Sequence, residues 1–172
     1  MKLRHTAVSA FLTSLMLLIC ASCVTDPDES ADSLQAGDML PEFSVRMADG
    51  STVSRESLAG RPSVICFFNT GCEDCRRELP ELQRAFEMSS ELENCPRFVC
   101  IARDEKEADI ARFWADNGLT LPYSPQEGRA VYELFAKSVI PRIYISSPSL
   151  RIIASYGDSS MPTAEEIINH LK

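Results

Sequence analysis

The sequence predicts an α/β domain with a central mixed β-sheet flanked by helices on both faces. Two continuously apolar runs, 64–68 and 98–102, are typical of strands that are buried on both faces. Segments with apolar residues at helical spacing follow both runs, and a strand pair and a last helix end the chain. With 172 residues, 45% of them apolar, the chain is long enough for one such domain and short for two.

The segment 1–22 is typical of a signal peptide. Lys2 and Arg4 precede an apolar run, 7–19, that is short for a membrane-spanning helix and is followed by small residues. A permanent N-terminal membrane helix is the alternative interpretation. Removing this segment takes the formal net charge from −8 to −10, because Lys2 and Arg4 are its only charged residues at neutral pH. An acidic chain with scattered basic residues excludes nucleic acid as a partner.

Cys23 follows an Ala-Ser pair and resembles the lipidated cysteine of bacterial lipoproteins, although Cys20 stands where that motif usually has Leu. The resemblance implies that Cys23 carries a lipid anchor and begins the mature chain. Residues 23–35 are polar and acidic, as in a solvated tether. We therefore expect a signal peptide, an acidic tether and a domain over 36–172, anchored to a membrane of the bacterial cell envelope and facing the periplasm or the cell surface.

The domain begins with a predicted N-terminal β-hairpin. Phe43, Val45 and Met47 alternate with other residues as in a half-buried strand, and Asp49-Gly50 supply the turn to a short strand at 52–53.

The apolar run 64–68 is expected at the centre of the sheet. A helix begins at the cysteine pair 72–75 and contains Pro80, which should kink it. The second buried strand, 98–102, precedes a helix that ends at Asn117-Gly118, a helix-stop signal.

The C-terminal part predicts a helical insertion, either a helix or a partial helix, at 131–139 and then two strands, 142–146 and 152–156. Thr163 and Glu166 have the spacing of a capping box, so the last helix begins there and runs to Leu171.

Cys72 and Cys75 form a C-x-x-C pair where a helix follows a buried strand. Two thiols at this spacing lie close enough to form a disulfide, and the helix N-terminus favours the thiolate of the first. Cys72 is therefore expected to attack a substrate disulfide, and Cys75 to resolve the mixed disulfide. No cofactor is expected beyond this redox-active disulfide.

A zinc site and a structural disulfide are the alternatives. Zinc would need two further ligands, and Cys95 and Cys100 are the next pair. If Cys100 lies in a strand, roughly 16 Å of extended chain separates them, which also excludes a disulfide between the two. The Cys72–Cys75 loop is too short for a disulfide to add much stability. No metal is therefore expected.

The remaining cysteines are not expected to form a site. Cys66 is interpreted mainly as a small apolar core residue, with a third redox thiol as the alternative, and Cys95 and Cys100 are interpreted as structural.

The segment 37–80 resembles the membrane-tethered thioredoxin-like oxidoreductases, which include the reductases of cytochrome c maturation and belong to the redoxin and peroxiredoxin-related superfamily. Its motifs are GDMLPEF, DG, LAGRP and FFNTGCEDCRRELP, and the similarity continues through Val139-Ile140-Pro141 to the last helix. The resemblance implies a thioredoxin-like fold over nearly all of the mature domain.

The resemblance also implies roles for single residues. Pro141 matches the cis-proline beside the cysteine pair, and Ile140 would offer backbone groups to a substrate peptide. Glu78 matches an acidic residue that assists proton transfer to the thiols; a solvent-exposed helix glutamate is the alternative. Gly71 stands in the substrate-binding region where a Trp is common, so one wall of the usual groove is missing. Cys66 stands where the superfamily often has a polar or acidic residue beneath the active site.

Glu73 and Asp74 place negative charge between the cysteines, which disfavours the thiolate and favours a reducing enzyme over a strong oxidant. The expected function is thiol-disulfide exchange between Cys72–Cys75 and cysteines of exported proteins, by a monomer that a membrane electron donor recharges. The alternatives are a peroxiredoxin-like peroxidase and a non-catalytic thioredoxin-fold binding module of an envelope complex. The peroxidase signature Pro-x-x-x-Thr-x-x-Cys is absent, since Thr70 lies only two residues before Cys72.

Overall fold

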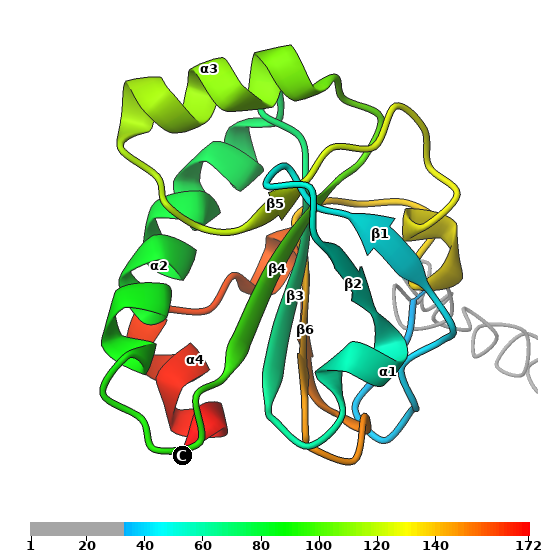
Figure 1. The fold of residues 1–172 in the computed structure, drawn as a ribbon, viewed down its shortest axis with the longest axis vertical. Coiled ribbons are helices and arrows are strands. Elements are labelled where there is room, and N and C mark those ends of the chain that lie inside the picture. Colours follow the sequence, from blue (N-terminus) through cyan, green and yellow to red (C-terminus); the bar gives the residue numbers. More distant parts are fainter. Residues whose placement is uncertain (1–32) are drawn as a thin grey trace, which may run out of the picture.

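The computed structural model describes residues 33–172, so the predicted signal peptide, Cys23 and most of the predicted tether lie outside the described residues. The elements in chain order are β1 Ser44–Arg46, β2 Thr52–Ser54, α1 Arg55–Leu58, β3 Ser63–Phe68, α2 Glu73–Ser89, β4 Arg97–Ala102, α3 Glu107–Asn117, β5 Tyr123–Ser124, η2 Tyr132–Leu134, β6 Arg142–Ser146, β7 Ile152–Tyr156, η3 Asp158–Ser160 and α4 Ala164–Leu171 (Figure 1). Within residues 33–172 no helix is long and apolar enough to span a membrane.

The central sheet has five strands in the order β5-β4-β3-β6-β7. β3 runs parallel to β4 and antiparallel to β6, while β5 extends the parallel side and β7 the antiparallel side. All six residues of β3 are buried, as expected for a strand in the middle of a sheet covered on both faces. The predicted mixed sheet with β3 at its centre is therefore confirmed.

The two faces of the sheet are covered differently. α2, α3 and α4 lie over one face, and the β1–β2 pair, α1 and η2 lie over the other (Figure 1). Side chains of β3 alternate between these faces: Phe68 packs on Trp114 of α3, and Phe67 packs on Phe135 beyond η2, with ring centroids 5.0 and 4.9 Å apart. Helical elements flank both faces as predicted, but the three longest share one of them.

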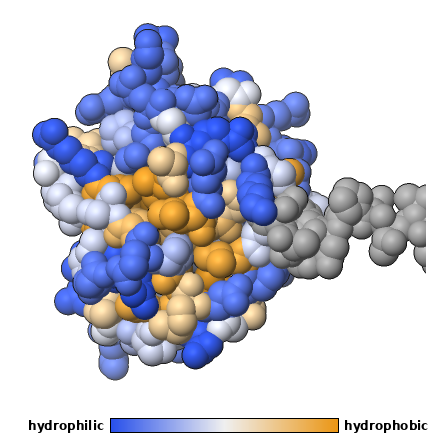
Figure 2. Space-filling model, turned by 90° about the vertical axis from the view of Figure 1, so that its right-hand side faces the viewer, coloured by the Kyte–Doolittle hydropathy of each residue, from blue (hydrophilic) through white to orange (hydrophobic). Residues whose placement is uncertain are grey.

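On the face without the long helices, apolar side chains gather in a central area that hydrophilic side chains surround (Figure 2). β1 and β2 pair antiparallel with Val45 opposite Val53, and both side chains are buried. The alternating pattern of the first strand thus turns its apolar side chains inward.

The helix or partial helix expected at 131–139 is partial: a single 3₁₀ turn, Tyr132–Leu134. The backbone carbonyl of Phe135 accepts hydrogen bonds from Leu34 N–H at 2.9 Å and from Tyr144 Oη at 3.0 Å. Tyr132 Oη donates to Val139 O at 2.8 Å. An α-helix over 131–139 would need the Phe135 carbonyl as the acceptor for Val139 N–H, but Leu34 and Tyr144 already occupy that carbonyl.

The folded part of the chain extends past the predicted boundary at residue 36. Ser33, assigned to the tether by the sequence, forms an isolated antiparallel bridge with Ala136. Leu34 packs against the core and donates its N–H to Phe135 O. The last residues of the predicted tether are therefore attached to the domain.

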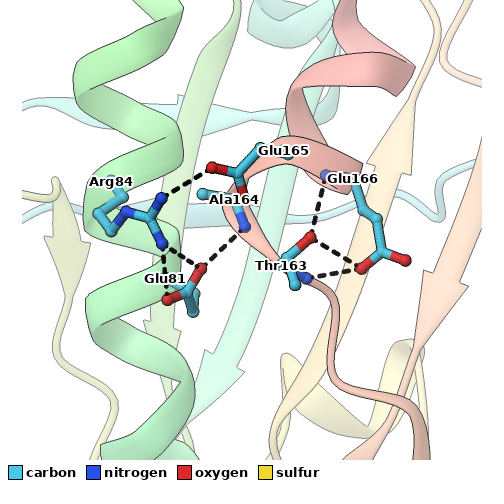
Figure 3. Close-up of polar contacts among 6 residues, drawn as sticks. All are labelled: Glu81, Arg84, Thr163, Ala164, Glu165 and Glu166. Carbon is cyan, nitrogen blue, oxygen red and sulfur yellow. Dashed lines mark hydrogen bonds and ion pairs between the residues drawn. The ribbon is translucent and has the colours of Figure 1, made fainter.

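α4 begins at the predicted capping box and is tied to α2 (Figure 3). Thr163 Oγ1 accepts from Glu166 N–H at 3.3 Å, and the Glu166 carboxylate accepts from Thr163 N–H at 2.8 Å. Glu81 of α2 accepts from Ala164 N–H at 3.0 Å and from the Arg84 guanidinium at 3.0 Å. These contacts hold α4 against the helix that begins at the cysteine pair.

Candidate active site

Cys72 is the N-cap of α2, just beyond the end of β3. Its Sγ accepts a hydrogen bond from Cys75 N–H at 3.4 Å and lies 3.6 Å from the carbonyl oxygen of Ile140, to which the thiol donates. Cys72 is partly exposed, whereas Cys75 is fully buried, and both are free thiols. A substrate can therefore reach Cys72, while Cys75 lies behind it.

The Ile140–Pro141 peptide bond is cis, in agreement with the resemblance. It precedes β6, which pairs with β3, so the Ile140 carbonyl comes next to Cys72 from a position 68 residues further along the chain. The structure thus brings together four predicted site residues, namely both cysteines, Ile140 and Pro141.

Cys75 differs from Cys72 in its electrostatic surroundings. Burial is the main cause that raises the pKa of the Cys75 thiol, and the neighbouring Cys72 raises it further. A backbone hydrogen bond from Asn69 and the positive charge of Arg103 act in the opposite direction. The Cys75 thiol is therefore protonated at neutral pH, and it needs a proton acceptor before it can attack a disulfide.

Glu78 lies on the same face of α2 as Cys75, and it is only 2% exposed, so the alternative of a solvent-exposed glutamate is wrong. Its Oε1 has no hydrogen-bond partner among the described residues. Burial raises the pKa of Glu78 to about 8, and the negative charges of Glu81 and Glu166 add to the effect. A carboxyl group that titrates near neutral pH can both accept and release a proton. Its spacing, three residues after Cys75 and four before Leu82, is the sequence signal for this buried position.

The loop between β3 and α2 is held by the loop that follows β4. Thr70 N–H donates to the Glu105 carboxylate at 2.9 Å, and Asn69 Nδ2 donates to Arg103 O at 3.2 Å. Gly71 N–H donates to Asn69 Oδ1 at 2.8 Å, and a Cβ at position 71 would lie 3.1 Å from that oxygen. Gly71 therefore lets the Asn69 carboxamide bridge the two loops and leaves the surface beside Cys72 without a side chain. Asn69 and Glu105 were not predicted as site residues, because nothing in the local sequence marks loops that meet in space.

The negative charge between the cysteines is smaller than the sequence alone implies. Asp74 forms an ion pair with Arg77 one turn along α2, so part of its charge is compensated. Glu73 is exposed to solvent, where its charge is screened.

The other described cysteines occupy two settings. Cys66 and Cys100 are buried and lie opposite each other on β3 and β4, whereas Cys95 is exposed just before β4. Across residues 33–172, no group of three or more His, Cys, Asp or Glu side chains is arranged to hold a metal ion. The Cys66–Cys100 pair was not predicted, because strand register cannot be read from either strand alone.

Comparison with known proteins identifies relatives that are named as thiol-disulfide oxidoreductases. The chain is 24% identical over 147 residues to the thiol-disulfide oxidoreductase ResA of Oceanobacillus iheyensis, covering 81% of this chain and 76% of that protein. It is 22% identical over 144 residues to ResA of Bacillus subtilis, covering 81% and 78%.

Solved structures confirm the fold. The thioredoxin domain of a thiol-disulfide oxidoreductase from Bacteroides vulgatus superimposes with a TM-score of 0.67 at 20% identity, covering 80% of this chain and 95% of that one. Residues 36–154 match the model of the AhpC/TSA family, which is more than half of the chain. The resemblance to thioredoxin-like oxidoreductases is thereby confirmed, and the chain belongs to the AhpC/TSA family.

Proposed function

We propose that this protein is a thiol-disulfide oxidoreductase that exchanges a Cys72–Cys75 disulfide with cysteines of exported proteins. One observation carries the proposal: the partly exposed Cys72 lies 3.6 Å from the Ile140 carbonyl, in front of the fully buried Cys75. Two-step exchange requires one thiol that meets the substrate and a second that meets only the first. The names of the ResA relatives support the same chemistry.

In the reducing direction, the Cys72 thiolate attacks one sulfur of a substrate disulfide, and the other substrate sulfur leaves as a thiolate and takes up a proton. The N-terminus of α2 stabilises the attacking thiolate. Cys75 then attacks Cys72 Sγ, which forms the Cys72–Cys75 disulfide and releases the second substrate thiol. The Cys75 proton passes to Glu78, the buried carboxylate one helical turn away.

A substrate peptide would lie along the segment before Pro141, with the backbone of Ile140 pairing to it as a neighbouring strand does. The exposed backbone at Gly71 would border this path.

In the same proposal Cys23 carries the lipid anchor, and the domain acts as a monomer in the cell envelope. A membrane electron donor reduces the Cys72–Cys75 disulfide again after each cycle.

The reduction potential of the Cys72–Cys75 couple, measured in the purified full chain, tests the proposed direction. A potential near or below about −270 mV, the value of thioredoxin, would support a reductase. A potential near about −120 mV, the value of a strong periplasmic oxidant, would show that the protein donates disulfides instead.

Two activity assays separate the alternatives. We expect insulin-disulfide reduction by the wild type and none by Cys75→Ser, which should instead accumulate mixed disulfides with its substrates. Peroxide consumption without insulin reduction would indicate the peroxidase, and failure of Cys72 and Cys75 to form a disulfide would indicate the binding module.

A further inference from the structure

A second pair of thiols lies inside the sheet beneath the candidate active site. Cys66 of β3 and Cys100 of β4 are direct partners in the parallel register, and each is 1% exposed. Partners in register on parallel strands project their side chains to the same face of the sheet. With strands about 4.8 Å apart, their Cα atoms fall within the 4.4–6.8 Å range that disulfides span.

This pair lies on the face that α2 covers. The neighbouring Cys100 thiol and then burial raise the pKa of Cys66, and the charges of Cys75 and Glu78 act on Cys66 in the same sense. Cys75 is 0% exposed and Glu78 2% exposed. Three thiols and one carboxyl group therefore share a single buried cluster behind Cys72.

We propose that Cys66 and Cys100 are a second redox-active pair, which exchanges disulfide bonds with the Cys72–Cys75 pair through Cys75. The proposal rests on the thiol-disulfide exchange proposed above for Cys72 and Cys75. It extends that activity, because the domain then holds two electron pairs instead of one.

The exchange balances without another reactant. Cys66 loses its proton to the Glu78 carboxylate and attacks Cys75 Sγ; the Cys72–Cys75 bond breaks, and Cys72 leaves as a thiolate that takes up a proton. Cys100 loses its proton and attacks Cys66 Sγ, which releases Cys75 as a thiolate that is protonated in turn. Two electrons and two protons have then passed from the buried dithiol to the Cys72–Cys75 disulfide; the same steps in reverse return them, and the relative potentials of the two pairs set the net direction.

The sheet geometry sets the order in which the two pairs are oxidised. In-register side chains on neighbouring strands begin about 4.8 Å apart, whereas the Cβ atoms of a disulfide lie about 3.8 Å apart. Closing the Cys66–Cys100 bond must draw the strands together, and a strained disulfide is easier to reduce. The buried pair is therefore oxidised only in more oxidising buffers than the Cys72–Cys75 pair.

Disulfide mapping of the full chain tests this inference without any variant. The chain is equilibrated in glutathione buffers of increasing potential, acid-quenched, alkylated in denaturant and digested without reduction. Chymotrypsin cleaves after Phe67 and Phe68 and a glutamate-specific protease after Glu73, so Cys66, Cys72 and Cys75 fall on separate peptides. We expect the Cys72–Cys75 link first and the Cys66–Cys100 link in the more oxidising buffers.

Three variants test the route. Cys75→Ser should leave Cys66 and Cys100 reduced in the folded chain, because oxidised glutathione cannot reach them directly. The double variant Cys72→Ser/Cys100→Ala should form a Cys66–Cys75 disulfide, since those thiols alone remain in the cluster. In a Cys20→Ser/Cys23→Ser/Cys95→Ser background, which leaves only the four thiols of the two pairs, Cys66→Ala should halve the reducing equivalents that the reduced chain delivers.

The outcomes distinguish this inference from the proposed function. If Cys66 and Cys100 stay alkylated at every potential at which Cys72–Cys75 is fully linked, the buried pair is only core packing and the inference is overturned, while the proposed function stands. A Cys66–Cys100 link that still forms in Cys75→Ser would overturn the route through Cys75. If no Cys72–Cys75 link forms either, the proposed function fails with the inference.

Discussion

The two faces of β3 are both buried, yet they differ in chemistry. On one face Phe67 packs against three aromatic rings, Tyr132, Phe135 and Tyr144, with centroids 4.9 to 6.3 Å away. On the other face Cys66 lies beside Cys100, beneath the part of α2 that carries the resolving cysteine and Glu78. One strand thus carries an aromatic packing surface and, one residue earlier, a thiol of the buried cluster.

Both faces also bury polar side chains, including Arg142 opposite Phe67 on the aromatic face and Glu78 on the helix face. On the aromatic face the hydroxyl groups of Tyr132 and Tyr144 both donate to backbone carbonyls of the segment that leads to Pro141. On the helix face Glu78 keeps an oxygen without a partner among the described residues, although it is almost fully buried. Unpaired buried polar groups are costly, so one that persists points to a role in proton transfer. In the proposed mechanism the helix face supplies the reacting groups, and the aromatic face supports them.

The largest expected effect falls on the helix face, at its exposed end. Cys72→Ser should reduce the rate of insulin-disulfide reduction to the uncatalysed background, because a serine hydroxyl cannot form a disulfide. Serine is a favoured N-cap residue, so the free energy of unfolding should change by no more than about 0.5 kcal/mol. Cys95→Ser is the matched control and should retain the wild-type rate. Activity remaining in Cys72→Ser would assign the attacking thiol elsewhere.

Substitutions on the aromatic face should affect the stability of the domain and not its redox potential. Phe67→Ala should lower the free energy of unfolding by about 3–5 kcal/mol, because it removes a fully buried ring and leaves a cavity. Urea unfolding of this variant is compared with Ile153→Ala, whose side chain on β7 is partly exposed and should cost much less. The Cys72–Cys75 potential of folded Phe67→Ala should match the wild type. A shifted potential would show that the two faces are not independent.

Comparing Glu78→Gln with the wild type at different pH values separates the effect of Glu78 on stability from its effect on the rate of insulin reduction. The folded-state pKa of Glu78, about 8, is above its ordinary value of 4.5, so the unfolded chain loses this proton first and the wild type loses stability as pH rises from about 4.5 to 8. Glutamine does not ionise, so the variant should be more stable than the wild type by about 5 kcal/mol at pH 9, and the difference should vanish near pH 4.

Urea unfolding at the two pH values measures this difference, and Glu165→Gln, a change at an exposed carboxylate of α4, is the control. The same Glu78→Gln protein should reduce insulin more slowly, because Cys75 loses its proton acceptor. An equal stability gain at pH 4 and pH 9 would rule out titration of Glu78 as the cause.

The smallest effect is expected at the contact between α2 and α4. Thr163→Ala removes the capping hydroxyl of α4 and should lower the free energy of unfolding by about 1 kcal/mol, with no change in the Cys72–Cys75 potential. Thr163→Ser keeps the hydroxyl and should restore most of the loss in urea unfolding. If Thr163→Ala shifts the potential, the α2–α4 contact reaches the active site and is more than a structural support.

Local patterns predicted the elements that depend on short-range rules. The strand bounds 142–146 and 152–156 and the helix stop at Gly118 agree with the structure, and so does the capping box at Thr163. The pattern missed α1 and β5, because four and two residues are too short to show a period. Of the helix or partial helix expected at 131–139, the structure has a 3₁₀ turn; the Phe135 carbonyl there accepts from Leu34 N–H and Tyr144 Oη, which lie outside the segment.

The sequence by itself determined where the Cys72 and Cys75 pair stands in the fold, since a C-x-x-C after an apolar strand and before a helical period is a local signal. Only the tertiary structure decided which groups surround that pair. The Ile140 carbonyl reaches Cys72 through the pairing of β6 with β3, and Cys66 meets Cys100 through the register of β3 and β4. Register is set by contacts between segments far apart in the chain, and the burial of Glu78 by what packs over α2, so neither can be read from one segment alone.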